Sequence, residues 1–69
     1  MIFNIWNLGN HENELLANSN GERFKYNLGQ TRGMWWQAIT PDGIVLFESD
    51  SAMEFAYLLN MGNCQIVAR

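Results

Sequence analysis

Residues 33–69 decide the fold of this chain and read GMWWQAITPDGIVLFESDSAMEFAYLLNMGNCQIVAR. Apolar alternation, a turn and a pair of helix-end signals follow one another along this stretch. They predict a strand at 34–40, a returning strand at 44–48, a helix from Ser51 to Gly62 and a strand at 64–68. Pro41 sets the backbone angle that begins a turn and Gly43 supplies a left-handed residue, so the first two strands should form a hairpin. The stretch therefore predicts a strand-strand-helix-strand unit.

The predicted helix carries two separate apolar stripes. It begins at Ser51, which with Glu54 three residues later forms a capping box, where each side chain accepts a hydrogen bond from a backbone N–H. At about 100° per residue, the stripe expected to face the core contains Ala52, Phe55, Ala56 and Leu59, with Leu58 at its edge. The stripe on the far side contains Met53, Tyr57 and Met61. Monomers rarely expose such a row, so we expect it to be a contact surface.

The predicted hairpin also has apolar residues on both sides. In a regular register Ile39 lies opposite Val45, Gln37 opposite Phe47 and Trp36 opposite Glu48. One face then carries Trp35, Gln37, Ile39, Val45 and Phe47, and the other carries Met34, Trp36, Ala38, Ile44 and Leu46. A single helix covers one face of a sheet. We therefore expect the second face to be covered by the amino-terminal region, by another copy of the chain or by a partner.

The amino-terminal half contains three further candidate strands. Residues 2–8 alternate well enough for one strand, which we expect to pair with the carboxy-terminal strand or with the hairpin. Residues 11–17 are ambiguous, because Asn10 could cap a one-turn helix there or residues 14–17 could form a short strand, and we favour the strand. The Asn20-Gly21 pair predicts a tight turn into a strand at 23–28, with Phe24, Tyr26 and Leu28 facing inward.

Together these elements predict one compact domain over residues 1–69. Its fold class is α+β, with a small, mostly antiparallel sheet of four to six strands, one principal helix packed on it and a carboxy-terminal ββαβ unit. With 48% hydrophobic residues the chain is globular in composition. At 69 residues, however, it is short for a large internal cavity.

Composition also narrows the range of partners. The formal charge of −3 and a pI near 4.8 argue against extended nucleic acid, whose binding depends on many Lys and Arg contacts with phosphate. Cys64 is the single cysteine, so an internal disulfide is excluded and a reduced, cytoplasmic setting is expected, the host cytoplasm if the chain is phage-encoded. No apolar run approaches the roughly 20 residues of a membrane span, so no membrane partner is predicted.

Residue types that could support catalysis are few. His11 lies beside Glu12 and Glu14, but the spacing matches no metal motif, and we interpret the group as a solvated loop. Cys64 precedes an apolar strand and is interpreted as a small buried residue rather than a nucleophile. We therefore predict that the chain is not an enzyme and has no metal site and no cofactor.

Two groups of residues remain as candidate sites. The first is an interface, in which Met53, Tyr57 and Met61 are joined by whichever of Trp35 and Trp36 faces away from the core. The second is an anion or nucleotide site, in which basic and polar residues lie beside the same two tryptophans. Its members are Arg23, Lys25, Gln30, Thr31 and Arg32.

These candidates predict a small non-enzymatic binding protein that acts by contact with another protein. The concrete form we expect is a phage or mobile-element inhibitor of a host defence factor, acting as a homo-oligomer, with its acidic rim attracting a basic target surface. One alternative is an oligomeric protein that sequesters a nucleotide or anion through the basic-aromatic cluster. Another is a small structural subunit of a larger assembly.

Overall fold

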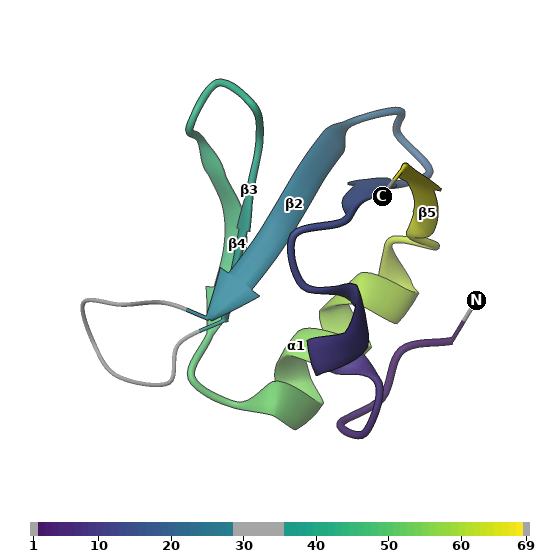
Figure 1. The fold of residues 1–69 in the computed structure, drawn as a ribbon, viewed down its shortest axis with the longest axis vertical. Helices are drawn as coiled ribbons and strands as arrows, with labels where there is room; N and C mark the ends of the chain where they lie inside the picture. Colours follow the sequence, from purple (N-terminus) through teal and green to yellow (C-terminus); the bar gives the residue numbers. More distant parts are fainter. Residues whose placement is uncertain (1, 29–35, 69) are drawn as a thin grey trace.

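The computed structural model describes residues 2–28 and 36–68 (Figure 1). Its elements are η1 (Leu8–His11), β1 (Leu15–Ala17), β2 (Arg23–Leu28), β3 (Trp36–Ile39), β4 (Val45–Ser49), α1 (Ala52–Met61) and β5 (Gln65–Ala68). Over these two ranges the strands form a five-stranded sheet in the order β4-β3-β2-β1-β5, with every neighbouring pair antiparallel. The predicted α+β class and ββαβ unit are confirmed, and residues 14–17 do contain a short strand.

The two predicted tight turns are present where glycines allow a left-handed backbone. Gly21 has φ of 81° and Gly43 has φ of 88°. In the second turn the Thr40 N–H donates to the Ile44 carbonyl and the Gly43 N–H donates to the Thr40 carbonyl, both at 2.9 Å. The β3-β4 hairpin is thereby closed by a three-residue loop, in which Gly43 is the left-handed residue as predicted.

The register of this hairpin differs from the regular one. Ile39 lies opposite Val45 as predicted, but a shift between Ala38 and Ile39 places Ala38 opposite Phe47, Gln37 opposite Glu48 and Trp36 opposite Ser49. The predicted pairs Gln37–Phe47 and Trp36–Glu48 are therefore wrong. A bulge inserts one extra residue into a strand and redirects the side chains that follow it. Here it moves Phe47 to the side of the sheet that carries Trp36 and Ala38.

The bulge brings Phe47 and Trp36 together on one face of the sheet. Phe47 and Trp36 pack against Phe55 of α1, with ring centroids 5.3 and 5.8 Å from the Phe55 ring. The opposite face is mixed. Lys25 is exposed there and Gln37 Nε2 donates to Glu48 Oε2 at 2.9 Å, while Ile39 lies opposite the partly exposed Val45 on the same face. Of the residues predicted for the second apolar face, Phe47 therefore lies on the helix side instead, whereas Ile39 and Val45 remain on the open face as predicted.

Two serines accept hydrogen bonds from backbone N–H groups at the start of α1. Ser51 Oγ accepts a hydrogen bond from the Glu54 N–H at 3.2 Å, as in the predicted capping box. The Ser51 N–H donates instead to Ser49 Oγ at 3.0 Å, so Ser49 takes the place predicted for the Glu54 carboxylate. This contact explains why Ser49 is a buried polar residue at the end of β4.

Two backbone hydrogen bonds close the carboxy-terminal end of the helix at Asn63. The Cys64 N–H donates to the Leu59 carbonyl and the Asn63 N–H to the Asn60 carbonyl. Asn63 has φ of 52° and is the left-handed residue that this kind of helix end requires. Gly62 is needed for space rather than for its backbone angle, because a Cβ there would lie 3.2 Å from Cys64 Sγ.

Residues 2–8 do not form the predicted strand. Asn4 Oδ1 accepts from the N–H groups of Trp6 and Asn7, and Asn7 Oδ1 accepts from the Asn4 N–H, so the segment coils into turns before η1. Asparagine side chains that bond nearby backbone groups compete with a strand ladder in this way. The place predicted for this strand, beside the carboxy-terminal strand, belongs to β1, which pairs with β5.

The amino-terminal segment packs on the same side of the sheet as α1. The Tyr26 hydroxyl donates to the Leu8 carbonyl, while the Tyr26 ring lies 5.3 Å from that of Phe55. Between the sheet and this layer lies a core of buried residues: Phe3, Leu8, Leu16, Phe24, Tyr26, Ala38, Phe55, Ala56, Leu59 and Cys64. Across residues 2–28 and 36–68, no helix is long and apolar enough to cross a membrane.

Candidate functional site

The outer stripe of α1 is exposed, as the sequence predicts. Met53 is 69% exposed, Tyr57 61% and Met61 62%, while Phe55, Ala56 and Leu59 on the inner side are buried. The three exposed residues follow one another at every fourth position and span about 12 Å along the helix axis. They form a continuous ridge, which we call the outer stripe.

The turn formed by residues 4–7 is a second exposed apolar feature. It was not predicted from the sequence. It projects Trp6, which is 82% exposed, and Ile5. The turn is held against α1 by Asn60, whose Oδ1 accepts from the Phe3 N–H and whose Nδ2 donates to the Phe3 carbonyl, each at 2.8 Å. Asn60 therefore ties the backbone of this segment to the edge of the outer stripe.

Between this turn and the helix lies a groove of about 280 Å³. It is lined by Phe3, Asn4, Ile5, Trp6, Met53, Ala56, Tyr57 and Asn60, and we call it the Trp6 groove. Its volume is just below the range of about 300–1,000 Å³ that small-molecule sites occupy. Its lining is mainly apolar, with the amides of Asn4 and Asn60 as its polar groups. The groove therefore suits one or two large side chains of a partner better than a cofactor.

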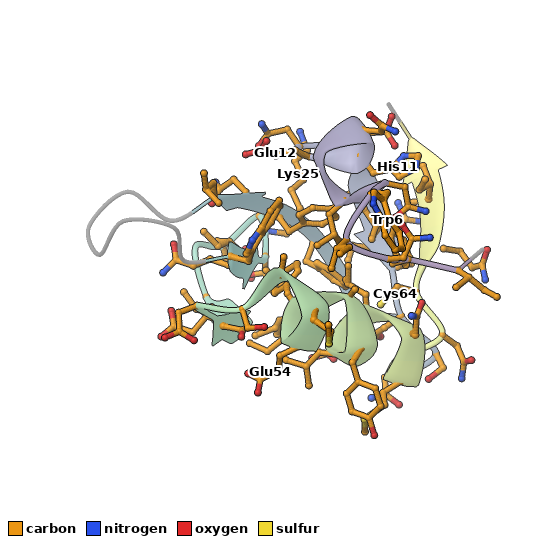
Figure 2. All side chains as sticks on the ribbon, turned by 90° about the horizontal axis from the view of Figure 1, so that it is seen from below. Trp6, His11, Glu12, Lys25, Glu54 and Cys64 are labelled. Atoms are coloured by element: carbon orange, nitrogen blue, oxygen red, sulfur yellow. The ribbon has the colours of Figure 1, made fainter. Side chains whose placement is uncertain are left out.

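Among the described residues, those at the amino-terminal end of α1 include a group of three carboxylates. Glu48, Asp50 and Glu54 line a second hollow with Ser49 at the amino-terminal end of α1. In Figure 2, Glu54 projects from the side of α1 opposite Trp6. Residues 2–14 and 45–63, which build this side of the molecule, contain neither Lys nor Arg. The apolar surface consequently has a negative border and no basic side chain from its own segments.

Of the predicted anion site, the structure describes Arg23, Lys25 and Trp36, and it places the two basic residues and Trp36 on opposite faces of the sheet. Arg23 and Lys25 are exposed and alternate with the buried Phe24 and Tyr26, so they project from the sheet face away from α1. Trp36, in contrast, packs on the helix side, where its ring stacks on that of Phe55. Gln30, Thr31, Arg32 and Trp35 lie outside the described residues. Lys25 does line a hollow of about 340 Å³, together with Asn13, Leu15, Asn27, Ile39, Thr40 and Pro41.

The position of Trp36 also bears on the predicted interface. Because Trp36 is half-buried against the core, it is not the tryptophan that accompanies the outer stripe. Trp35, the other candidate, lies outside the described residues. Trp6, which was predicted to lie in a strand, lines a groove with Met53 and Tyr57. The pattern Asn4-x-x-Asn7 is the signal that could have located it, since asparagines at this spacing favour a turn.

His11 and Cys64 have structural surroundings. His11 Nδ1 lies 2.8 Å from Glu14 Oε1, and the His11 ring meets Phe3 edge-on at 6.1 Å. With its side chain 16% exposed, His11 is not part of a solvated loop, and that prediction is wrong. Cys64 is buried as predicted, and burial raises the pKa of its thiol to about 11.

Tyr26 is a second buried group whose pKa is raised. Burial, with the nearby carboxylates of Glu14 and Glu12, raises the pKa of the Tyr26 phenol above its ordinary value, so Tyr26 stays neutral. In residues 2–28 and 36–68, no three His, Cys, Asp or Glu side chains are grouped so as to hold a metal ion. Comparison of the chain with protein-family models, with curated proteins and with solved structures returned no match.

Proposed function

We propose that this chain is a small non-enzymatic binding protein that acts through contact between the outer face of α1 and another protein. The observation that carries the proposal is the exposure of Met53, Tyr57 and Met61 together with Trp6. Trp6 and Tyr57 alone present roughly 300 Å² of surface, which already equals the largest apolar patch of many monomers. Aromatic and Met side chains are the residues that the centres of protein interfaces favour.

The fold supports a binding role for this surface because its stability does not need these side chains. The core is filled from the inner side of α1, and the three residues of the outer stripe leave most of their area in water. A contiguous exposed apolar patch with a polar border is typical of a protein-protein contact. A protein of this size that covers a partner's surface acts by excluding other ligands, so steric inhibition is the concrete form we propose.

Affinity capture with matched surface variants tests the proposal. The tagged protein, Tyr57→Glu and the control Ile44→Glu are used to capture proteins from a lysate of the source cell. Ile44 is 59% exposed at the tip of the β3-β4 hairpin, so its variant adds the same charge away from α1. We expect a protein retained by the wild type and by Ile44→Glu but lost by Tyr57→Glu. Retention of the same proteins by all three, with native circular dichroism, would contradict the proposal.

A further inference from the structure

The Trp6 groove and the outer stripe form one surface with an unusual combination of features. Its centre is apolar, its walls are two different segments of the chain, and its charged border is negative on the side of Glu54 (Figure 2). From this combination we infer that the surface binds a positively charged amphipathic helix of another protein. This inference rests on the function proposed above and names the class of partner.

The shape of the surface argues for a helical partner. The outer stripe is about 12 Å long and turns by only about 80° around the axis of α1, because its members recur every four residues. Side chains at positions i, i+4 and i+7 of a second helix cover a similar length on one face. Helices that pack on each other lie 8–10 Å apart. A helix beside α1 at that spacing would lie over Met53 and Tyr57 and direct an apolar side chain toward the Trp6 groove.

The groove supplies a place for the main anchor of such a helix. Trp6 forms one wall and Tyr57 and Met53 the other, while Ala56 and Phe3 contribute to the lining between them. A volume of about 280 Å³ accepts a Leu, Phe or Trp side chain. Met is flexible and polarisable, so Met53 can adjust to anchors of different shape. We therefore expect tolerance for the identity of the anchor but a strict need for its apolar character.

The charge pattern selects a basic partner over a second copy of this chain. Glu54 lies on the edge of the outer stripe away from Asn60, and Glu48 and Asp50 adjoin it. A Lys or Arg on the flank of a bound helix could pair with these carboxylates. A second copy would bring further carboxylates to the same surface, since the segments that build it contain neither Lys nor Arg. Like charges brought together at an interface disfavour association.

The aromatic anchors and the charges at the border should contribute unequally to affinity. Removing a central aromatic anchor typically weakens an interface by roughly 10-fold or more. An exposed charge pair at the border contributes less, about 2- to 5-fold, and its effect falls as salt increases. The inference therefore predicts that Trp6 and Tyr57 determine affinity, whereas Glu54 contributes mainly to the choice between basic and acidic partners.

Calorimetry with two designed peptides tests the inference on the full chain. The first peptide, of about 16 residues, carries Leu at helical spacing with Lys at all other positions, and the second replaces every Lys by Glu. We expect the folded protein to bind the Leu/Lys peptide and to bind the Leu/Glu peptide at least 10-fold more weakly. Trp6→Ala should weaken binding of the Leu/Lys peptide roughly 10-fold or more. Glu54→Gln should weaken it about 2- to 5-fold and reduce its salt dependence.

A matched control variant distinguishes binding at a defined site from nonspecific hydrophobic binding. Ile44→Ser removes an exposed apolar residue on the β3-β4 hairpin, and binding of the Leu/Lys peptide should not change. Equal affinity for both peptides, or equal losses in Ile44→Ser and Trp6→Ala, would overturn the inference. So would a stable dimer in sedimentation that Tyr57→Glu dissociates, because a second copy would then be the occupant.

The outcomes also distinguish this inference from the function on which it rests. If a cellular partner is lost in Tyr57→Glu but the Leu/Lys peptide is not bound, the binding function stands and the partner class is wrong. If the peptide does not bind and no partner depends on Tyr57, both are wrong. Circular dichroism of each variant verifies that the fold is retained, as expected for Trp6→Ala because most of the Trp6 side chain lies in solvent.

Discussion

The two faces of α1 are similar in composition but opposite in environment. The inner face, with Phe55, Ala56 and Leu59, is buried against the sheet and the amino-terminal segment. The outer face, with Met53, Tyr57 and Met61, is equally apolar and open to solvent. The comparison teaches that one helix can specify the fold through one face and offer a binding surface with the other. Substitutions on the inner face should therefore change stability, and substitutions on the outer face should change binding.

The largest effect on stability is expected for Phe55→Ala. The Phe55 ring is fully buried and contacts the rings of Tyr26, Trp36 and Phe47. Replacing a buried Phe by Ala removes apolar burial and leaves a cavity, which costs about 3–5 kcal/mol. Small domains often have a free energy of unfolding of only about 5 kcal/mol, so the variant should be close to unfolded. Urea denaturation followed by circular dichroism measures the loss.

The control for this prediction lies two residues away on the outer face. Met53→Ala shortens an exposed side chain and improves helix propensity slightly, so the free energy of unfolding should change by less than about 0.5 kcal/mol. If Met53→Ala destabilised the chain as much as Phe55→Ala, the outer face would be part of the folding core. The separation of the two faces would then be wrong.

The separation of the two helix faces was readable from the sequence. A helix repeats every 3.6 residues. That period alone places Phe55 and Leu59 in one stripe and Tyr57 and Met61 in the other. The turns at Gly21 and Gly43 were equally readable, because a left-handed backbone favours Gly. Patterns that depend on near neighbours along the chain were therefore sufficient for the ββαβ unit.

The register of the hairpin was not readable in the same way. Val45, Leu46 and Phe47 are all apolar, so alternation does not reveal which residue is the extra one in a bulge. The decision depends on packing, since Phe47 lies 5.3 Å from Phe55 and 5.7 Å from Phe24 only after the shift. Contacts with residues distant in sequence determined this detail, and with it the face of the sheet on which Phe47 lies.

The amino-terminal half of the Trp6 groove was missed for a related reason. Residues 2–8 alternate as a strand does, yet side-chain hydrogen bonds of Asn4 and Asn7 coil them into turns. The groove also depends on Asn60, which meets Phe3 across 57 positions of sequence. The helical half of the candidate site was thus predictable from periodicity, while its other half required the tertiary structure.

Asn60→Ala should show the next largest effect, because Asn60 lies at the border between the two faces. Its side chain makes two hydrogen bonds to Phe3, whose backbone groups would lose their partners. That loss costs about 2–3 kcal/mol, and the better helix propensity of Ala offsets about 0.5 kcal/mol of it. We expect a net loss of about 2 kcal/mol in thermal or urea unfolding, together with weaker binding at the Trp6 groove.

Asn10→Ala is the matched control for Asn60→Ala. Asn10 is an exposed residue of η1, and its replacement should change the free energy of unfolding by less than about 0.5 kcal/mol. If the two variants had equal stability, the hydrogen bonds between α1 and the amino-terminal segment would not contribute to the fold. The groove would then have only one firmly held wall.

A smaller effect is expected from the Cys64 thiol at alkaline pH. Its pKa rises from an ordinary 9.0 to about 11 on folding, because burial disfavours the thiolate. A raised pKa means that the stabilising effect is complete below pH 9 and is lost as the pH rises toward 11. Between pH 8 and 10 we expect stability to fall by roughly 1 kcal/mol, and the slope should be shallower in Cys64→Ala. Urea midpoints measured at each pH give the slope, and identical slopes in the two proteins would contradict the assignment.

The smallest effect on stability is expected for Tyr57→Ser on the outer face. Most of the Tyr57 side chain lies in water, so its removal should change the free energy of unfolding by less than about 0.5 kcal/mol. The same change removes one wall of the Trp6 groove, and affinity for the partner should fall roughly 10-fold or more. Urea denaturation and calorimetry with the Leu/Lys peptide, performed on one preparation, measure the two quantities together. A variant that loses stability and affinity in proportion would mean that the outer face binds only as a consequence of being folded. Loss of affinity alone would establish that the apolar character of this face serves binding.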